Sequence, residues 1–183
     1  YAFQSCPNLR EIAISNSVKS IGEGAFSGSG LKNLIIPNSV ENIGNYAFYG
    51  CGNLKELTIP SNVNNIGEHT FGACCNLEKL EISKNIITIE NYAFHNCAKL
   101  SHFVCYDATN ADYNALDKLI VPPNVTSIGE GAFDGCKNLK SIVLPSNLKY
   151  LGKNVFRYCE SIHFNEYDNA YYIGNDKNPY FVL

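Results

Sequence analysis

The sequence predicts an α/β repeat solenoid, with a parallel β-sheet along one side and short helical or 3₁₀ turns along the other. Three observations support this prediction. An Ala-Phe pair, or a close variant of it, recurs mostly every 22 or 23 residues, an apolar strand pattern precedes it, and a small residue, usually Cys, follows the Phe by three positions. The seven pairs are Ala2-Phe3, Ala25-Phe26, Ala47-Phe48, Thr70-Phe71, Ala93-Phe94, Ala132-Phe133 and Val155-Phe156.

The first part of each unit predicts a short strand with one face turned inward. In one unit the apolar residues Leu54, Leu57 and Ile59 precede Pro60. Alternation places Leu57 and Ile59 on the same face, and the Pro ends the strand because it offers no N–H to a ladder. Two apolar residues three positions apart, such as Val40 and Ile43, then precede a Gly such as Gly44. A Gly at this position suits either a positive φ or a close approach of two backbones. One unit has Glu90 at that position, so a positive φ is not strictly required there.

The Phe and the Cys of each unit should lie on one inward face, because residues three apart share a face of a helical turn. The Cys column is Cys6, Cys51, Cys74, Cys97, Cys136 and Cys159, with Ser29 replacing Cys in the second unit. Parallel, in-register side chains are poorly arranged for a disulfide, so these residues are interpreted as reduced, buried thiols.

Two other uses of cysteine do not fit this pattern. The run His95, Cys97, His102 and Cys105 has a superficial zinc spacing, but Cys97 should point inward and His102 outward. A thiol nucleophile would need a His and an acid beside a partly exposed Cys, and the pattern places none there. The four histidines, His69, His95, His102 and His163, are interpreted as surface or edge residues.

The repeats predict one solenoid over residues 1–164, of about seven units. One interval is longer than the rest, because Phe94 and Phe133 are 39 residues apart (133 minus 94), which leaves an excess of about 16 residues near 101–116. Either a short extra repeat or a surface loop accounts for this excess. Residues 165–183 are interpreted as a partial repeat or a capping segment, and the whole chain as an excerpt from a longer protein.

The outward positions of the strands should line up across units and form a continuous face. One column is mixed polar and the next is half aliphatic, which suits either an ordinary solvated sheet or a contact surface for a partner. The candidate contact residues are Glu11, Asn33, Ile35, Glu56, Thr58, Lys79, Glu81, His102, Lys118, Ile120, Ser141 and Val143.

Composition excludes several classes of partner. The net charge is −3 with both signs interspersed, so the chain has no electrostatic footprint for nucleic acid. No apolar run approaches the roughly 18–20 residues that span a bilayer, so no membrane insertion is expected in this segment. No convergent catalytic constellation is apparent, and we expect no enzyme activity, no cofactor and no metal site.

The repeat L-K-E-L-T-I-P-S-N-V-N-N-I-G-E-H-T-F-G-A-C, from Leu54 to Cys74, closely resembles the BspA-like leucine-rich repeats, also called the Treponema pallidum type. The resemblance covers about residues 1–164 and rests on the combination I-G-x-x-A-F-x-x-C. It implies a right-handed, arc-shaped solenoid with the strands on the concave side. It also implies secretion or display on the cell surface and, in some members, adhesion to host matrix proteins or to other bacteria, without catalytic or metal residues.

These observations lead to a functional hypothesis with an alternative. The hypothesis is a non-enzymatic, extracellular module that binds a host matrix protein, another cell-surface protein or a glycan through the strand face. The alternative is a structural spacer that holds other domains away from the cell surface and binds nothing itself. Flanking domains of the full-length protein would discriminate between the two.

Overall fold

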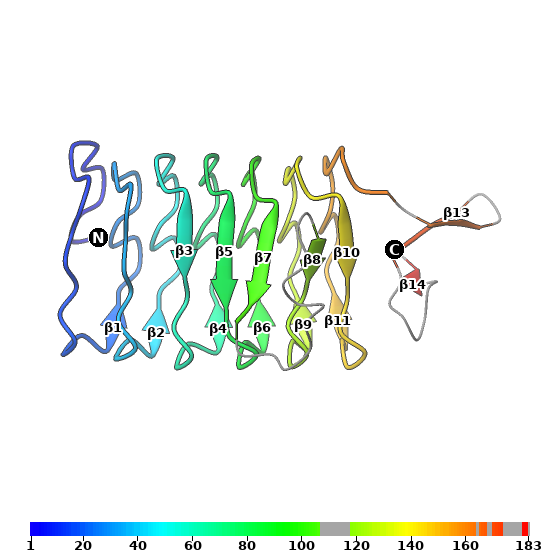
Figure 1. Ribbon diagram of the computed structural model, residues 1–183, viewed down its shortest axis with the longest axis horizontal. Coiled ribbons are helices and arrows are strands. Elements are labelled where there is room, and N and C mark those ends of the chain that lie inside the picture. The colour runs from blue at the N-terminus through cyan, green and yellow to red at the C-terminus, as the bar shows by residue number, and fades with distance from the viewer. Residues whose placement is uncertain (107–117, 164, 168–169, 174–180, 183) are drawn as a thin grey trace.

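The computed structural model describes residues 1–106, 118–163, 165–167, 170–173 and 181–182. The units stack side by side along the long axis of the molecule, with the strands of one sheet facing the viewer in Figure 1. Successive strands pair in parallel, unit to unit. The molecule is therefore a parallel β-solenoid, as the repeat predicts.

The strand pattern L-x-x-L-x-I forms the larger sheet. Its strands pair in the order β10-β8-β7-β5-β3, and the inward residues Leu57, Leu80 and Ile142 are buried while their neighbours in sequence are not. This alternation is what a sheet with one solvated face requires. The five strands are β3 (Glu56–Thr58), β5 (Lys79–Ile82), β7 (His102–Cys105), β8 (Lys118–Ile120) and β10 (Ser141–Val143).

Shorter strands lie before each Gly of the repeat. Four of them pair in the order β11-β9-β6-β4, and β1 (Ser20–Ile21) pairs separately with β2 (Asn42–Ile43). The four are β4 (Asn65–Ile66), β6 (Thr88–Ile89), β9 (Ser127–Ile128) and β11 (Tyr150–Leu151). Beyond the repeats, β12 (Asn165–Tyr167), β13 (Ala170–Ile173) and β14 (Phe181–Val182) pair antiparallel. The interpretation of 165–183 as a partial repeat or cap stays a prediction.

The repeat phenylalanines form one continuous column through the solenoid. Six successive pairs stack with interplanar angles of 2° to 14° and centroid distances of 5.3 to 5.9 Å. The rings from Phe26 to Phe156 are buried, whereas Phe3 is 38% exposed. Each fully buried ring contributes roughly 1.5–3 kcal/mol, so this column is a main source of stability and confirms the predicted core.

The cysteine column lies beside the phenylalanines and is held by an unexpected bond. Within this column, the thiols of Cys51, Cys74, Cys97, Cys136 and Cys159 each donate to the main-chain carbonyl of the Phe in the preceding unit, at Sγ···O distances of 3.1 to 3.3 Å. Ser29 shares the column and lies 3.4 Å from the Cys51 sulfur. All eight cysteines are outside disulfides, Cys75 is exposed and Cys105 is buried. The interpretation as reduced structural thiols therefore agrees with the structure.

The turns that carry the Phe are not helical, which corrects the α/β prediction. No α- or 3₁₀-helix occurs within the part of the chain that the structure describes. Instead, successive main-chain N–H groups donate alternately to a carbonyl of their own turn and to a carbonyl of the next unit. Ala47 donates to Gly44 within its own turn, while Phe48 donates to Thr70 of the next unit. A helix cannot form because half of the donors serve the neighbouring unit instead of their own turn.

Positive φ angles make this alternation possible. They occur two residues before and two residues after the repeat Phe, and most of the residues that adopt them are not Gly. Before the Phe they are Gly24, Tyr46, His69, Tyr92, Gly131 and Asn154. After it they are Ser5, Gly28, Gly50, Ala73, Asn96, Gly135 and Tyr158. Bulky residues rarely adopt this conformation. The main-chain hydrogen bonds of the turn, within the unit and to the next unit, must therefore hold these residues in it.

At most of the short strands the Gly that follows serves close packing and not a positive φ, and Gly22 is the exception because a Cβ there would meet no atom within 4 Å. A Cβ on Gly44 would lie 2.6 Å from the main-chain nitrogen of Glu23, and one on Gly152 would lie 2.4 Å from that of Glu130. Of the two explanations that the sequence offered, close approach is therefore the right one.

The long interval between Phe94 and Phe133 adds a strand without adding a full unit. Strands β7 and β8 both join the larger sheet, where Phe103 pairs with Leu119. On the other side β6 pairs directly with β9, and Phe94 donates its N–H to Ala132. The described residues thus form half of an extra unit, in which Phe103 packs edge-on against Phe94 and Phe133. Residues 107–117 of the predicted insertion lie outside the described residues.

Candidate interaction surface

The outward residues of the larger sheet form the surface that the sequence singled out, which we call the strand face. Register brings its columns together, because Glu56 lies opposite Lys79, Lys79 opposite His102, and Lys118 opposite Ser141. In the second column Thr58 lies opposite Glu81 and Ile120 opposite Val143. Ala13 and Ile35 form an isolated parallel bridge in the first two units.

Exposure along the strand face falls from the N-terminal units toward the later ones. Ile35 is 83% exposed, the highest value among the large apolar side chains that the structure describes. Glu11, Asn33, Glu56 and Thr58 are also exposed, whereas Lys79, Glu81, His102, Ser141 and Val143 are half-buried. The N-terminal half is therefore the part most available to a partner.

One predicted contact residue is not accessible. Ile120 is only 5% exposed, although it follows the inward Leu119 and so belongs to the outward row. Its neighbour in register on β10 is the apolar Val143. Apolar side chains that adjoin on a sheet shield one another from water, which removes Ile120 from the candidate contact residues.

The centre of the strand face carries a closed polar cluster. Lys79 Nζ lies 2.7 Å from Glu81 Oε1, and the Thr58 hydroxyl donates to Glu81 Oε2 at 2.8 Å. The hydrogen bond with Glu81 raises the pKa of Lys79, and the same bond lowers the pKa of Glu81. Since both charges are already paired, this cluster offers a partner little net charge.

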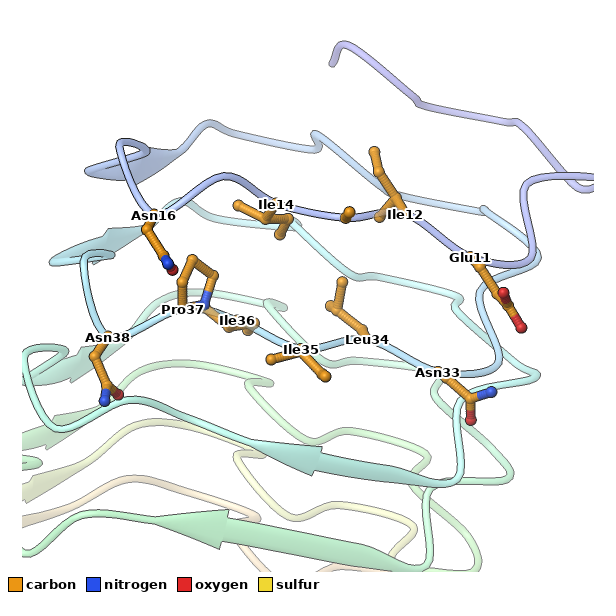
Figure 2. Close-up of a pocket in the computed structure, with 11 residues that line it drawn as sticks. Glu11, Ile12, Ile14, Asn16, Asn33, Leu34, Ile35, Ile36, Pro37 and Asn38 are labelled. Atoms are coloured by element: carbon orange, nitrogen blue, oxygen red, sulfur yellow. The ribbon is translucent and has the colours of Figure 1, made fainter.

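A wide hollow opens in the first two units, shown in Figure 2. It has a volume of about 700 Å³ and is lined by apolar residues with a polar rim. The apolar part includes Ile12, Ile14, Leu34 and Ile36, and Glu11, Asn16, Asn33 and Asn38 stand at the rim. Such a mixture suits contact with the side chains of a partner better than chemistry on a small substrate.

The described residues show neither a metal-binding cluster nor, in the Cys column, an activated thiol. No cluster of three metal-ligating side chains occurs among the described residues. His102 Nδ1 lies 2.9 Å from the hydroxyl of Ser101, its neighbour in sequence. Burial raises the pKa of the Cys51, Cys74, Cys97 and Cys136 thiols, and that of Cys159 to about 12, so these sulfurs stay protonated at neutral pH. No helix in the described part of the chain is long and apolar enough to cross a bilayer.

Sequence reasoning missed a second organised surface on the turns. His69 and His95, which were interpreted as surface or edge residues, are half-buried among tyrosine rings. His69 lies two residues before the repeat Phe and His95 one residue after it. Aromatic residues at these same two positions in neighbouring units, such as Tyr46 and Tyr49, were the signal that could have revealed it.

Comparison with known proteins agrees with the repeat geometry. The sequence model of the BspA type leucine rich repeat region matches residues 1–115 and 110–177, with six copies. No curated protein matches the chain in sequence. A solved leucine-rich repeat protein from Bacteroides ovatus superposes with a TM-score of 0.68 at 28% identity, over 87% of this chain and 43% of that one.

Two further solved structures share the fold. The T. pallidum leucine-rich repeat protein gives a TM-score of 0.63 at 25% identity, over 87% of this chain and 69% of that one. The pneumococcal vaccine antigen PcpA gives 0.53 at 20% identity, over 91% of this chain and 34% of that one. The chain thus spans less than half of the Bacteroides protein and about two thirds of the T. pallidum protein. With the family match covering most of its length, this chain belongs to the BspA-type leucine-rich repeat family.

Proposed function

We propose that this chain is a non-enzymatic, extracellular interaction segment that binds a protein or a glycan through the N-terminal half of its strand face. The observation that carries the proposal is the exposed Ile35 beside the open hollow of the first two units, in line with the exposed Glu11, Asn33 and Glu56. An apolar side chain within a polar rim is the usual composition of a protein contact. Proteins of this repeat class commonly use a solenoid surface in this way.

The test is a binding screen of the folded chain against matrix glycoproteins, cell-surface proteins and a glycan array. Two variants probe the surface, Ile35→Asp and Glu56→Lys. Lys79 is a poorer choice because its reversal would also release Glu81. We expect saturable binding that both variants weaken by more than tenfold, or about 1.4 kcal/mol.

Matched controls lie away from the strand face. Ile87→Asp makes the same change at another exposed isoleucine, and Lys137→Glu/Glu160→Lys exchanges the two charges of an exposed ion pair while keeping them paired. Both should bind like the unmodified chain. Equal losses in the probes and the controls would contradict a strand-face site.

A structural spacer is the second candidate, and the unbroken phenylalanine column favours it. A continuous stack from Phe3 to Phe156 gives a stiff rod. The absence of any binding by a folded chain would favour the spacer. In the full-length protein, an anchor at one end and a recognition domain at the other would support the same conclusion.

Display on the cell surface is part of the proposal and is tested separately. Antibodies raised against this chain should label intact cells of the source organism, and protease added to intact cells should remove the label. An enzyme or a metal protein would instead show stoichiometric metal or reactive native thiols. Metal analysis and thiol titration of the native protein test that third hypothesis.

A further inference from the structure

A set of aromatic and imidazole rings joins the turns of three successive units. We call it the turn ridge, and it comprises Tyr46, Tyr49, His69, Tyr92 and His95. The His69 ring stacks between Tyr46 and Tyr92, with centroids 4.8 and 5.0 Å away and interplanar angles of 17° and 13°. His95 lies edge-on to Tyr92 at 5.9 Å and to His69 at 6.3 Å. The two imidazoles are therefore packing elements between units.

Each imidazole buries one ring nitrogen away from any polar partner in the described part of the chain. The Nδ1 atoms of His69 and His95 are buried and have no hydrogen-bond partner among the residues that the structure describes. A neutral imidazole can leave one ring nitrogen as an unused acceptor, but an imidazolium carries an N–H on both nitrogens. Protonation would thus create a buried donor without an acceptor, which is costly.

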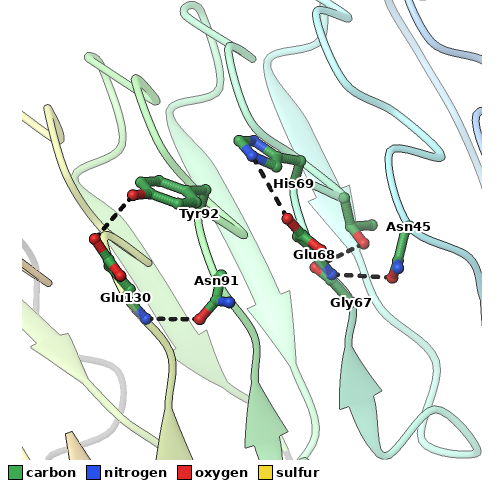
Figure 3. A network of polar contacts seen from close by, with 8 residues as sticks. Asn45, Gly67, Glu68, His69, Asn91, Tyr92 and Glu130 are labelled. Atoms are coloured by element: carbon green, nitrogen blue, oxygen red, sulfur yellow. Dashed lines mark hydrogen bonds and ion pairs between the residues drawn. The ribbon is translucent and has the colours of Figure 1, made fainter. Parts of the chain in front are cut away.

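The charged and titratable groups around His69 do not offset this cost. The Glu68 carboxylate lies 4.0 Å from His69 Nε2, and the main-chain N–H of Glu68 donates to Asn45 Oδ1 at 3.0 Å, as Figure 3 shows. On the far side, the Tyr92 hydroxyl donates to Glu130 Oε1 at 3.1 Å. The remaining titratable neighbours are the phenols of Tyr46 and Tyr49 and the imidazole of His95.

The balance of these effects favours the neutral ring. Burial lowers the pKa of His69 below 6.5, Glu68 opposes that shift, and His95 adds to it. Two imidazoles that both gain a proton would also repel one another.

We propose that the turn ridge is an acid-sensitive joint of the solenoid. Neutral His69 keeps three units packed at neutral pH, and its protonation in mild acid opens the turns around it before the strand face separates. The sign follows from linkage. Folding disfavours the protonated ring, so the stabilising contribution is complete above the unfolded pKa near 6.5 and is lost as the pH falls below it.

The amide hydrogens that cross the ridge report such an opening. His69 donates its N–H to Asn91, and Ala73 donates its N–H to His95, at 3.0 and 2.7 Å. Hydrogen exchange, corrected for intrinsic rates, is compared at about pH 7.5 and about pH 5, with strand β5 as the internal reference. We expect protection of the ridge amides to fall by about tenfold in acid relative to β5, and the Tm to fall by about 2–4 °C.

The array itself supplies the variants. His69→Tyr copies the residue found at the same position in both adjacent units, and His69→Tyr/His95→Tyr copies the pattern of Tyr46 and Tyr49. Both should remove most of the acid-induced loss of protection. His163→Gln changes an exposed histidine outside the ridge and should leave that loss unchanged.

Two outcomes would overturn the proposal. One is an equal acid response in the His69→Tyr/His95→Tyr variant and in the unmodified chain. The other is an NMR titration of the unmodified chain in which His69 protonates at or above about pH 6.5, since that would mean that folding does not disfavour its charged form. The NMR titration needs no variant, so it decides the question even if the variants fail to fold.

Discussion

Phe94 and Phe133 stack with their ring centroids 5.3 Å apart, although 39 residues (133 minus 94) separate them in sequence. The adjacent pair Phe71 and Phe94 is equally close, at 5.6 Å, with the ordinary repeat spacing. The described residues between Phe94 and Phe133 therefore add a strand to the larger sheet, where β7 and β8 lie next to one another, and add no ring to the phenylalanine column. The phenylalanine column passes the insertion without interruption.

Replacing Phe94 by Ala should lower the free energy of unfolding by about 3–5 kcal/mol. The substitution leaves a cavity and removes the stacking contacts with Phe71 and Phe133 and the edge contact with Phe103. Urea unfolding followed by circular dichroism measures the loss. Phe3→Ala, at the exposed end of the column, should cost much less. Similar losses at the two positions would show that the column does not act as the main core.

The period alone predicted most of this core. The Phe and Cys columns, the inward strand residues and the outward columns follow from one aligned repeat, since each unit must bury its apolar face on the next. The turns could not be predicted in the same way. Spacing of three indicated a helical turn, but the positive φ of Tyr46 and His69 is imposed by bonds to the next unit and not by local propensity.

Two features of the surface also escaped prediction because they depend on neighbours far apart in sequence. Ile120 follows the outward pattern and is nevertheless buried on the strand face, next to Val143. The stack of His69 between two tyrosines needs residues from three units at one turn position. The sequence of a single unit reveals neither the burial of Ile120 nor the stacking of His69.

The thiols should differ sharply in reactivity. At about pH 8, Ellman's reagent should react at once with the exposed Cys75 and more slowly with the half-buried Cys6, while burial protects the others and a raised pKa adds to that protection in the buried Cys column. After denaturation all eight cysteines should react. Mass spectrometry of the alkylated native protein identifies the sites. Rapid native labelling of Cys97 would contradict its place in the buried column.

The buried thiols of the Cys column, from Cys51 to Cys159, predict a loss of stability in alkali. Folding raises their pKa, so the folded chain holds protons that the unfolded chain releases. The stabilisation that these protonated thiols give the folded chain is complete below the ordinary thiol pKa near 9. It is lost as the pH rises toward about 12, the pKa of Cys159 in the folded chain. Urea midpoints measured across this range should fall steeply. Cys97→Ala should unfold with a shallower pH dependence, since it removes one of the groups whose pKa is strongly raised.

Two glycines at the same repeat position should respond in opposite ways to an added methyl group. A Cβ on Gly44 would lie 2.6 Å from the Glu23 nitrogen, whereas one on Gly22 would meet no atom within 4 Å. Gly44→Ala should therefore cost about 1–3 kcal/mol through overpacking, and Gly22→Ala should be neutral or slightly stabilising. Glu90 shows that a larger residue is tolerated at this position where Asn65 can bind its carboxylate. Thermal unfolding of the two variants measures the difference, and equal Tm values would mean that close approach between units does not select the glycine.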